Sequence, residues 1–225
     1  MGRGARWPRP RDRRLARVVV VDAGRGLSAL ARGVVAQATA SGLVCLAITG
    51  SSGKTSTKDL LGQVLAAAGP TVSPEGSFNN EIGVPLTACG VDADTRFLIA
   101  EMGARGQGHV AGLCRIVPPD VGVVLNVGHA HLGEFGSVAA IARAKGELVE
   151  ALGPDGWAVL NADDSSVLGM ASRTAARRAP LSLRGGPTHG APPGWAGDHT
   201  AAEGQAHHST PRPAGGGGTA EGGSR

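Results

Sequence analysis

The chain has 225 residues and a formal net charge of +4 at pH 7, with 22 Lys and Arg against 18 Asp and Glu. Its apolar runs are short, and the valines at 18–21 end at an aspartate, so we expect neither a membrane span nor a secretory signal. The three cysteines lack metal-site spacing and an even count, which argues against a disulfide framework and predicts core thiols in a reducing compartment. Seven arginines in residues 1–17 predict a solvated basic extension. Together these features favour a cytoplasmic protein.

Apolar, β-rich runs alternate along the chain with amphipathic helical patterns. Such alternation predicts an α/β fold, in which a mostly parallel sheet has helices on both faces. The second of the expected helices carries Leu60, Leu61, Val64, Leu65 and Ala68 on one side, and we expect its Lys58 to be solvated. The expected strands are residues 18–22, 43–48, 97–100, 121–127 and 157–160, and the expected helices are 26–38, 57–68, 107–116 and 137–152.

The last part of the chain has a different composition. From residue 175 onward, Leu181 and Leu183 are the only residues of the Leu, Ile or Val type, among many glycines and prolines. Such a segment buries too little apolar area to offset the cost of ordering its backbone. We therefore predict a disordered tail over 173–225, in which the histidines are solvated rather than metal-binding.

A glycine-flanked loop, Gly-Ser-Ser-Gly-Lys-Thr-Ser, connects the expected strand at 43–48 to the next helix. In this context the backbone N–H groups and the helix N-terminus bind phosphates, the lysine contacts the β- and γ-phosphates, and the threonine hydroxyl can ligate Mg²⁺. The sequence thus predicts a P-loop-type site for a nucleoside triphosphate. Its residues are Gly50, Ser51, Ser52, Gly53, Lys54, Thr55 and Ser56.

The loop is a shortened form, because Ile48 occupies the position of the first glycine in the general pattern. This form resembles the loop of the Mur ligases and their folate-polyglutamating relatives, ATP-dependent enzymes that join a carboxylate to an amine. Further strings agree in order and spacing: Asn-Asn-Glu-Ile-Gly-Val-Pro at 79–85, Ile-Ala-Glu-Met-Gly-Ala at 99–104, and the segments 126–136 and 142–147. The first of these is similar to the signature of the branch that adds D-alanyl-D-alanine to UDP-N-acetylmuramoyl-tripeptide.

The resemblance implies ATP and two Mg²⁺ ions. Thr55 and Glu101 would hold one ion, although a solvated acid at a strand end is the plain alternative for Glu101. His131 matches the family histidine that binds the second ion, whereas a structural hydrogen bond is the ordinary role of such a histidine. His129, a neighbour of the same type, has no such match.

Lys145 matches the lysine that this family carbamylates, and with Lys54 and His131 it completes the implied catalytic set. The chain has only three lysines, so a lysine in the helix at 137–152 is not a generic cation. Carbamylation needs a neutral amine, which burial and nearby cations favour. A surface lysine is the alternative.

Asn79 and Asn80 are either turn formers or, as the resemblance implies, part of the lining of the nucleotide and substrate cleft. At position 162 the chain has an alanine, whereas the guanine-binding motif of GTPases requires a different residue there. This difference favours ATP over GTP as the nucleotide.

The resemblance covers about residues 18–170 and implies a central ATP-binding domain at 41–172, preceded at 18–40 by a remnant of a UDP-sugar-binding domain and its link. It also implies a monomer that acts on UDP-N-acetylmuramoyl-tripeptide and D-alanyl-D-alanine, without nucleic acid or membrane partners. We expect a truncated, inactive ligase, because most of the UDP-sugar-binding domain, the rest of the central domain and the C-terminal domain that the resemblance implies are missing. The abrupt change in composition at 171–175 is what a reading-frame change or gene-model error would produce. The alternatives are a non-catalytic ATP-binding fragment and another Mur or folylpolyglutamate-type ligase.

Overall fold

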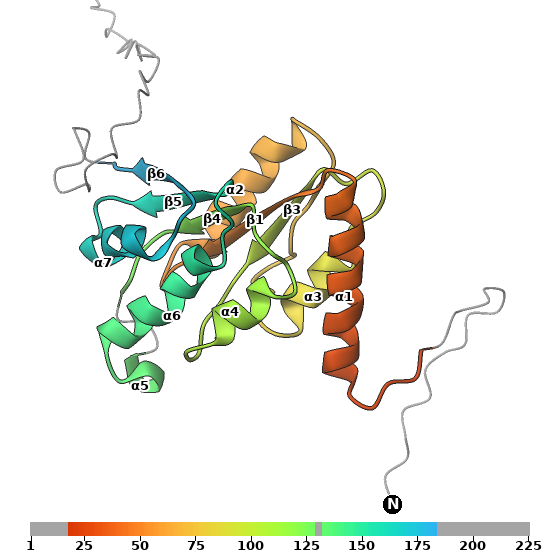
Figure 1. Cartoon of the computed structure of the whole chain (residues 1–225), viewed down its shortest axis with the longest axis horizontal. Coiled ribbons are helices and arrows are strands. Elements are labelled where there is room, and N and C mark those ends of the chain that lie inside the picture. Colours follow the sequence, from red (N-terminus) through yellow and green to blue (C-terminus); the bar gives the residue numbers. More distant parts are fainter. Residues whose placement is uncertain (1–17, 129–131, 184–225) are drawn as a thin grey trace, which may run out of the picture. The chain divides into compact units, whose positions relative to one another are not determined.

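The computed structural model describes residues 18–128 and 132–183, which form an α/β domain around one parallel sheet (Figure 1). The strand order is β2-β3-β1-β4-β5-β6, and every neighbouring pair is parallel. The strands are β1 (Val44–Thr49), β2 (Thr71–Val72), β3 (Phe97–Glu101), β4 (Val121–Val124), β5 (Trp157–Asn161) and β6 (Arg177–Leu181).

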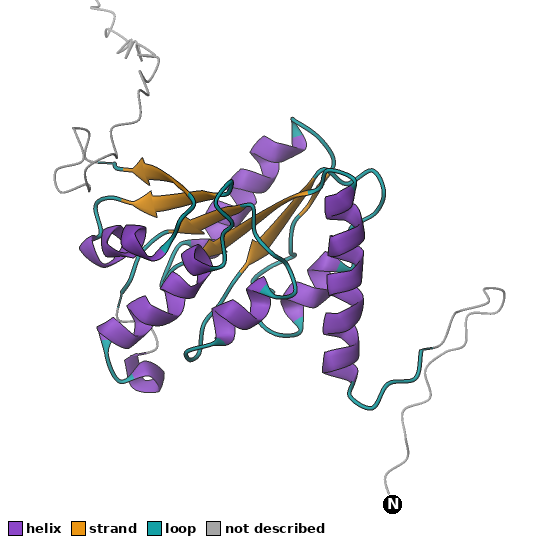
Figure 2. Ribbon diagram, in the orientation of Figure 1, coloured by secondary structure: helices purple, strands orange, loops and turns teal. Residues whose placement is uncertain are grey.

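Helices cover both faces of this sheet, as the alternating pattern predicted. Figures 1 and 2 show α2 behind the sheet and α4 and α6 in front of it. The helices are α1 (Ala23–Ala40), α2 (Lys54–Ala66), α3 (Gly83–Ala88), α4 (His109–Cys114), α5 (Leu132–Phe135), α6 (Val138–Glu150) and α7 (Ser165–Leu168), followed by the 3₁₀ helix η1 (Gly169–Arg173). In the described part of the chain, no helix is both long enough and apolar enough to cross a membrane.

The core lies between the sheet and its helices. Strand β1 is buried at every position except the first, because helices cover both of its faces and β3 and β4 pair with its edges. Ile48 and Ile99 are fully buried in the central strands, and burial of side chains of this size contributes about 1.5–3 kcal/mol each. Cys45 and Cys114 are buried free thiols, as predicted, and Cys89 is half-buried.

Two expectations for the first third of the chain are wrong. Residues 18–21 form no strand, and their valines are exposed. Asp22 instead caps α1, since its Oδ1 accepts a hydrogen bond from the Arg25 N–H at 2.7 Å. In α2 the expected apolar face is largely solvated, with Leu60 and Val64 65% and 67% exposed.

Lys58, which we expected in solvent, is the buried residue of α2 and is 2% exposed. Its Nζ donates to the Pro74 carbonyl at 2.7 Å and pairs with Asp59. The helical pattern could not reveal this contact, because the carbonyl belongs to a loop outside the helix.

Strand β6 lies inside the segment that composition predicted to be disordered, so that prediction is wrong for residues 177–181. The strand pairs with β5 from Trp157↔Arg177 to Asn161↔Leu181. It is an edge strand, half-exposed along its length, and Pro180 fits such a position because one edge needs no N–H donor. Edge strands need few aliphatic residues, which is why composition missed it. Residues 184–225 lie outside the described part of the chain.

Candidate nucleotide-binding site

The predicted phosphate loop connects the end of β1 to the start of α2. Gly53 has φ of 78°, a left-handed conformation that favours glycine, and it is the residue immediately before the helix. From there α2 presents the N–H groups of its first turn, which have no acceptor within the helix, together with the positive end of its dipole. The loop therefore has the backbone geometry that binds phosphate.

Asn126, in the loop after β4, holds the first half of the phosphate loop in place. Its Oδ1 accepts hydrogen bonds from the N–H groups of Ser51 and Ser52, both at 3.0 Å, and its Nδ2 donates to the Ser52 carbonyl at 3.2 Å. The Asn126 backbone carbonyl accepts a further bond from the Ser51 N–H at 3.1 Å. Sequence analysis gave Asn126 no role, although its place after a strand at the same sheet edge could have suggested one.

Glu101, the last residue of β3, lies beside the loop and is 1% exposed. Thr55 donates from Oγ1 to Glu101 Oε2 at 3.0 Å, and Asn79 donates from Nδ2 to Oε1 at 2.8 Å. A hydroxyl and a carboxylate at this spacing are the hard oxygen donors that Mg²⁺ takes together with nucleotide phosphates and water. The described residues contain no group of three or more His, Cys, Asp or Glu that could hold a metal by itself.

The two asparagines have different surroundings. Asn79 orients Glu101, whereas Asn80 accepts hydrogen bonds through its Oδ1 from the N–H groups of Ile82 and Gly83, at 3.2 and 2.8 Å, where α3 begins. Both residues also line the pocket described below. The hydrogen bonds of the Asn80 side chain are those of a turn-forming residue. The positions of Asn79 and Asn80 in the pocket lining also fit a role in the cleft.

Lys145 projects from α6 toward the phosphate loop and is 5% exposed. Burial, followed by the charge of Lys54, lowers the pKa of its amine from 10.5 to about 8. The described residues provide no hydrogen-bond or ion-pair partner for this amine. The alternative of a surface lysine is therefore wrong.

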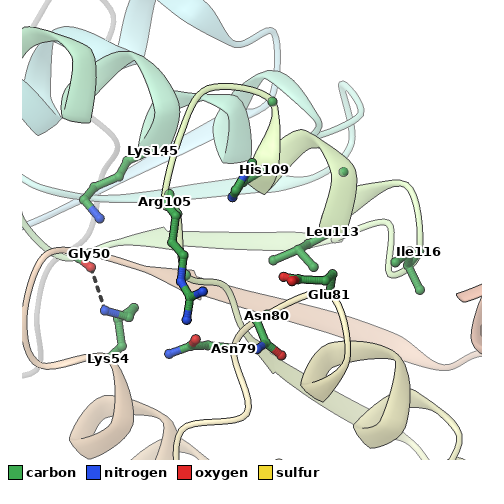
Figure 3. Close-up of a pocket in the computed structure, with 14 residues that line it drawn as sticks. Gly50, Lys54, Asn79, Asn80, Glu81, Arg105, His109, Leu113, Ile116 and Lys145 are labelled. Atoms are coloured by element: carbon green, nitrogen blue, oxygen red, sulfur yellow. Dashed lines mark hydrogen bonds between the residues drawn. The ribbon is translucent and has the colours of Figure 1, made fainter. Parts of the chain in front are cut away.

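Five of the predicted site residues line one pocket of about 470 Å³: Gly50, Lys54, Asn79, Asn80 and Lys145 (Figure 3). Lys54 lies at one end, where its Nζ donates to the Gly50 carbonyl at 2.9 Å, and Lys145 faces the same space from above. The other end combines polar and apolar groups for which no role was predicted: Glu81, His109, Leu113 and Ile116. Arg105 lies between the two ends, and its side chain reaches toward Asn79 (Figure 3). Arg105 follows the Glu-Met-Gly-Ala string directly, and its place after a strand end was the available signal.

Glu147, two residues after Lys145, fixes the far wall of the pocket. Its carboxylate accepts hydrogen bonds from the N–H groups of Gly108 and Ala111, at 2.6 and 2.9 Å, and so caps α4. Helix α6 therefore both carries Lys145 and positions α4. His131 and His129, the predicted second metal ligand and its neighbour, lie outside the described residues.

The sequence model of a protein family, the Mur ligase middle domain, matches residues 48–189. The chain belongs to the Mur ligase middle domain family. Family membership and the α/β fold, both predicted from the sequence, are thereby confirmed.

Several Mur ligases are similar to this chain. The UDP-N-acetylmuramoyl-tripeptide–D-alanyl-D-alanine ligase of Mycobacterium tuberculosis is 56% identical over 151 residues, which cover 67% of this chain and 30% of that protein. Among solved structures, MurF from Acinetobacter baumannii has a TM-score of 0.67 and 36% identity, and covers 77% of this chain and 38% of its own. The MurF ligase of Thermotoga maritima in complex with ADP has a TM-score of 0.65 and 32% identity. The match covers 77% of this chain and 39% of that protein. The chain thus spans 30% to 39% of the length of these relatives.

Proposed function

We propose that this chain is the nucleotide-binding part of an ATP-dependent ligase of peptidoglycan precursor synthesis, which joins D-alanyl-D-alanine to UDP-N-acetylmuramoyl-tripeptide in the cytoplasm. The observation that carries the proposal is the convergence of Lys54 and Lys145 on one pocket, next to the Thr55–Glu101 oxygen pair. The named relatives support the choice of substrates, since the M. tuberculosis relative is named for this reaction and the T. maritima relative was crystallised with ADP.

In this reaction the γ-phosphoryl group of ATP passes to the terminal carboxylate of the tripeptide, which gives an acyl phosphate and ADP. The amine of D-alanyl-D-alanine then attacks the acyl carbon, the amide bond forms, and phosphate and a proton leave. The protein supplies positioning and charge neutralisation rather than covalent chemistry.

The roles of the individual residues follow from their positions. Lys54 exchanges its bond to the Gly50 carbonyl for the β- and γ-phosphates, and the first turn of α2 offers N–H groups to the same oxygens. Glu101 and Thr55 hold Mg²⁺, while Asn79 keeps the Glu101 carboxylate oriented. The bound ion supplies charge neutralisation at the phosphates.

Lys145 adds its neutral amine to CO₂, so that an N–C bond forms and one proton leaves to solvent. The resulting carbamate would supply an anionic oxygen donor for a second Mg²⁺, and the family resemblance gives His131, which lies outside the described residues, as a further residue that would hold this ion. The low exposure of Lys145 and the nearby charge of Lys54 support this assignment, since both favour the neutral amine.

Titration calorimetry of the full chain with Mg·ATP tests the proposal. Binding by the wild-type chain and its loss in Lys54→Ala are expected, because the substitution removes the charge that meets the β- and γ-phosphates. Arg115→Ala removes one positive charge from an exposed position that does not line the pocket, and it should bind like wild type. Equal binding by wild type and Lys54→Ala would rule out the phosphate-loop assignment.

A further inference from the structure

Arg105 is the third basic side chain that faces the nucleotide pocket besides Lys54 and Lys145. It begins in the loop after β3, and Figure 3 shows its side chain crossing the pocket toward Asn79, on the side where Lys54 lies. The three cations thus approach the same space from three segments of the chain: the phosphate loop, the β3 loop and α6.

Arg105 is an exposed residue, so without a ligand its guanidinium is solvated. Within the described residues, no hydrogen bond, ion pair or aromatic ring engages its guanidinium. Other arginines in this part of the chain do have such partners: Arg173 pairs with Glu150, and Arg96 and Arg177 lie over aromatic rings. The carboxylate of Glu101 is already engaged by Thr55 and Asn79, so it does not supply the missing partner.

Lys54 and Arg105 are both cations that line this pocket, and two such charges repel one another unless an anion lies between them. The phosphate loop accounts for an anion at Lys54, and that loop approaches the pocket from one side only. Arg105 enters the pocket from the loop after β3, and its side chain reaches toward Asn79 (Figure 3). A guanidinium binds phosphoryl oxygens in a bidentate manner, and in some other phosphoryl-transfer enzymes an arginine stabilises the charge of the transferred group.

We infer that Arg105 is a catalytic residue of the proposed ligase, whose guanidinium binds the γ-phosphoryl group of ATP from the side opposite the phosphate loop. This inference rests on the proposed function, because it requires a nucleoside triphosphate in the pocket. The inference gives Lys54 and Arg105 different functions. Lys54 serves both the β- and the γ-phosphate, whereas Arg105 serves the γ-phosphate alone.

The test compares two nucleotides that differ in the γ-phosphoryl group, by calorimetry on the full chain. Mg·ADP and the Mg²⁺ complex of β,γ-imido-ATP are titrated into the wild type, Arg105→Ala, Arg105→Lys and Arg115→Ala. Arg105→Ala should weaken binding of the imido-ATP complex about 10-fold or more, the effect expected for loss of hydrogen bonds to a charged group, with Mg·ADP within about twofold of wild type. Arg105→Lys should recover part of the loss, because it keeps the charge but not the bidentate geometry.

Arg115→Ala removes the same charge outside the pocket and should bind both nucleotides like wild type. Guanidinium ion at millimolar concentration should restore part of the imido-ATP affinity of Arg105→Ala and leave its ADP affinity unchanged. If Arg105→Ala weakens both nucleotides equally, or neither, the inference is overturned while the proposed function stands. If the wild type binds neither nucleotide, both are overturned.

Discussion

Lys145 is a buried amine with no partner among the described residues, and such a group is costly unless it can become neutral. Burial and the charge of Lys54 bring its pKa to about 8, so that a useful fraction of the amine is unprotonated near neutral pH. Lys58 is equally buried but donates to the Pro74 carbonyl and pairs with Asp59. Lys58 in α2 thus has a structural role, whereas the amine of Lys145 in α6 is free to react.

We expect Lys145 to react with dissolved CO₂ in the isolated chain. Carbon-13 NMR at a fixed partial pressure of ¹³CO₂ should show a carbamate resonance that grows as the pH rises through about 8, because only the neutral amine reacts. Lys145→Arg should lack this resonance, since a guanidinium keeps its proton, and should retain the signal of the N-terminal amine as an internal reference. Identical spectra for wild type and Lys145→Arg at every pH would remove the carbamate from the mechanism.

Three consecutive residues of α6 have three different surroundings. Lys145 faces the pocket, Glu147 caps α4, and Gly146 lies under the guanidinium of Arg173. Arg173 donates to the carbonyls of Ala142 and Arg143 and so binds η1 to the helix. A Cβ at position 146 would collide with that guanidinium, which explains a glycine in the middle of a helix.

A double-mutant cycle should reveal this contact. Gly146→Ala alone should fail to stabilise the fold, because the gain in helix propensity, about 1 kcal/mol, is offset by displacement of Arg173. In an Arg173→Ala background the same substitution should raise the free energy of unfolding by about that gain, which chemical denaturation would measure. Equal effects of Gly146→Ala in the two backgrounds would mean that the two positions are not coupled.

Sequence patterns predicted those elements whose signal is local. The strands at β1, β3, β4 and β5 are apolar runs, and α6 has helical periodicity over its full length, so both were found within a few residues. The valines at 18–21 read as a strand because a pattern cannot show that no neighbouring strand pairs with them. Strand β6 was missed for the opposite reason: its sequence is weakly apolar, and the pairing with β5 defines it.

At the scale of the whole molecule, the pocket draws its lining from segments between Gly50 and Lys145, and the parallel sheet brings these segments to one edge. This is why Lys54 and Glu101 could be placed together from the sequence alone. The specific roles of Asn126 and Glu147 could not be predicted in the same way, because their hydrogen bonds join residues that are distant in the chain.

Nucleotide binding should therefore be visible well beyond the phosphate loop. Hydrogen–deuterium exchange of the full chain with saturating Mg·ADP should slow at residues 50–56, at the loop following β3 and in α4, since a ligand protects the segments that it joins. Strand β6 and helix α1 do not line the pocket and should exchange as before. Lys54→Ala should show none of the protection. Slowing confined to α2 would indicate that the nucleotide does not reach the β3 side of the pocket.

The hydrogen bonds of Asn126 have a consequence for the kinetics of association. Because the Asn126 amide oxygen already accepts hydrogen bonds from the N–H groups of Ser51 and Ser52, we expect the phosphates of a bound nucleotide to use donors from Gly53 onward. The loop is thus divided into an anchored half and a receiving half, and the receiving half starts from a fixed support. Because this loop is already ordered, nucleotide binding needs no preceding conformational change. We therefore expect one-step association, in which the observed rate rises in proportion to nucleotide concentration.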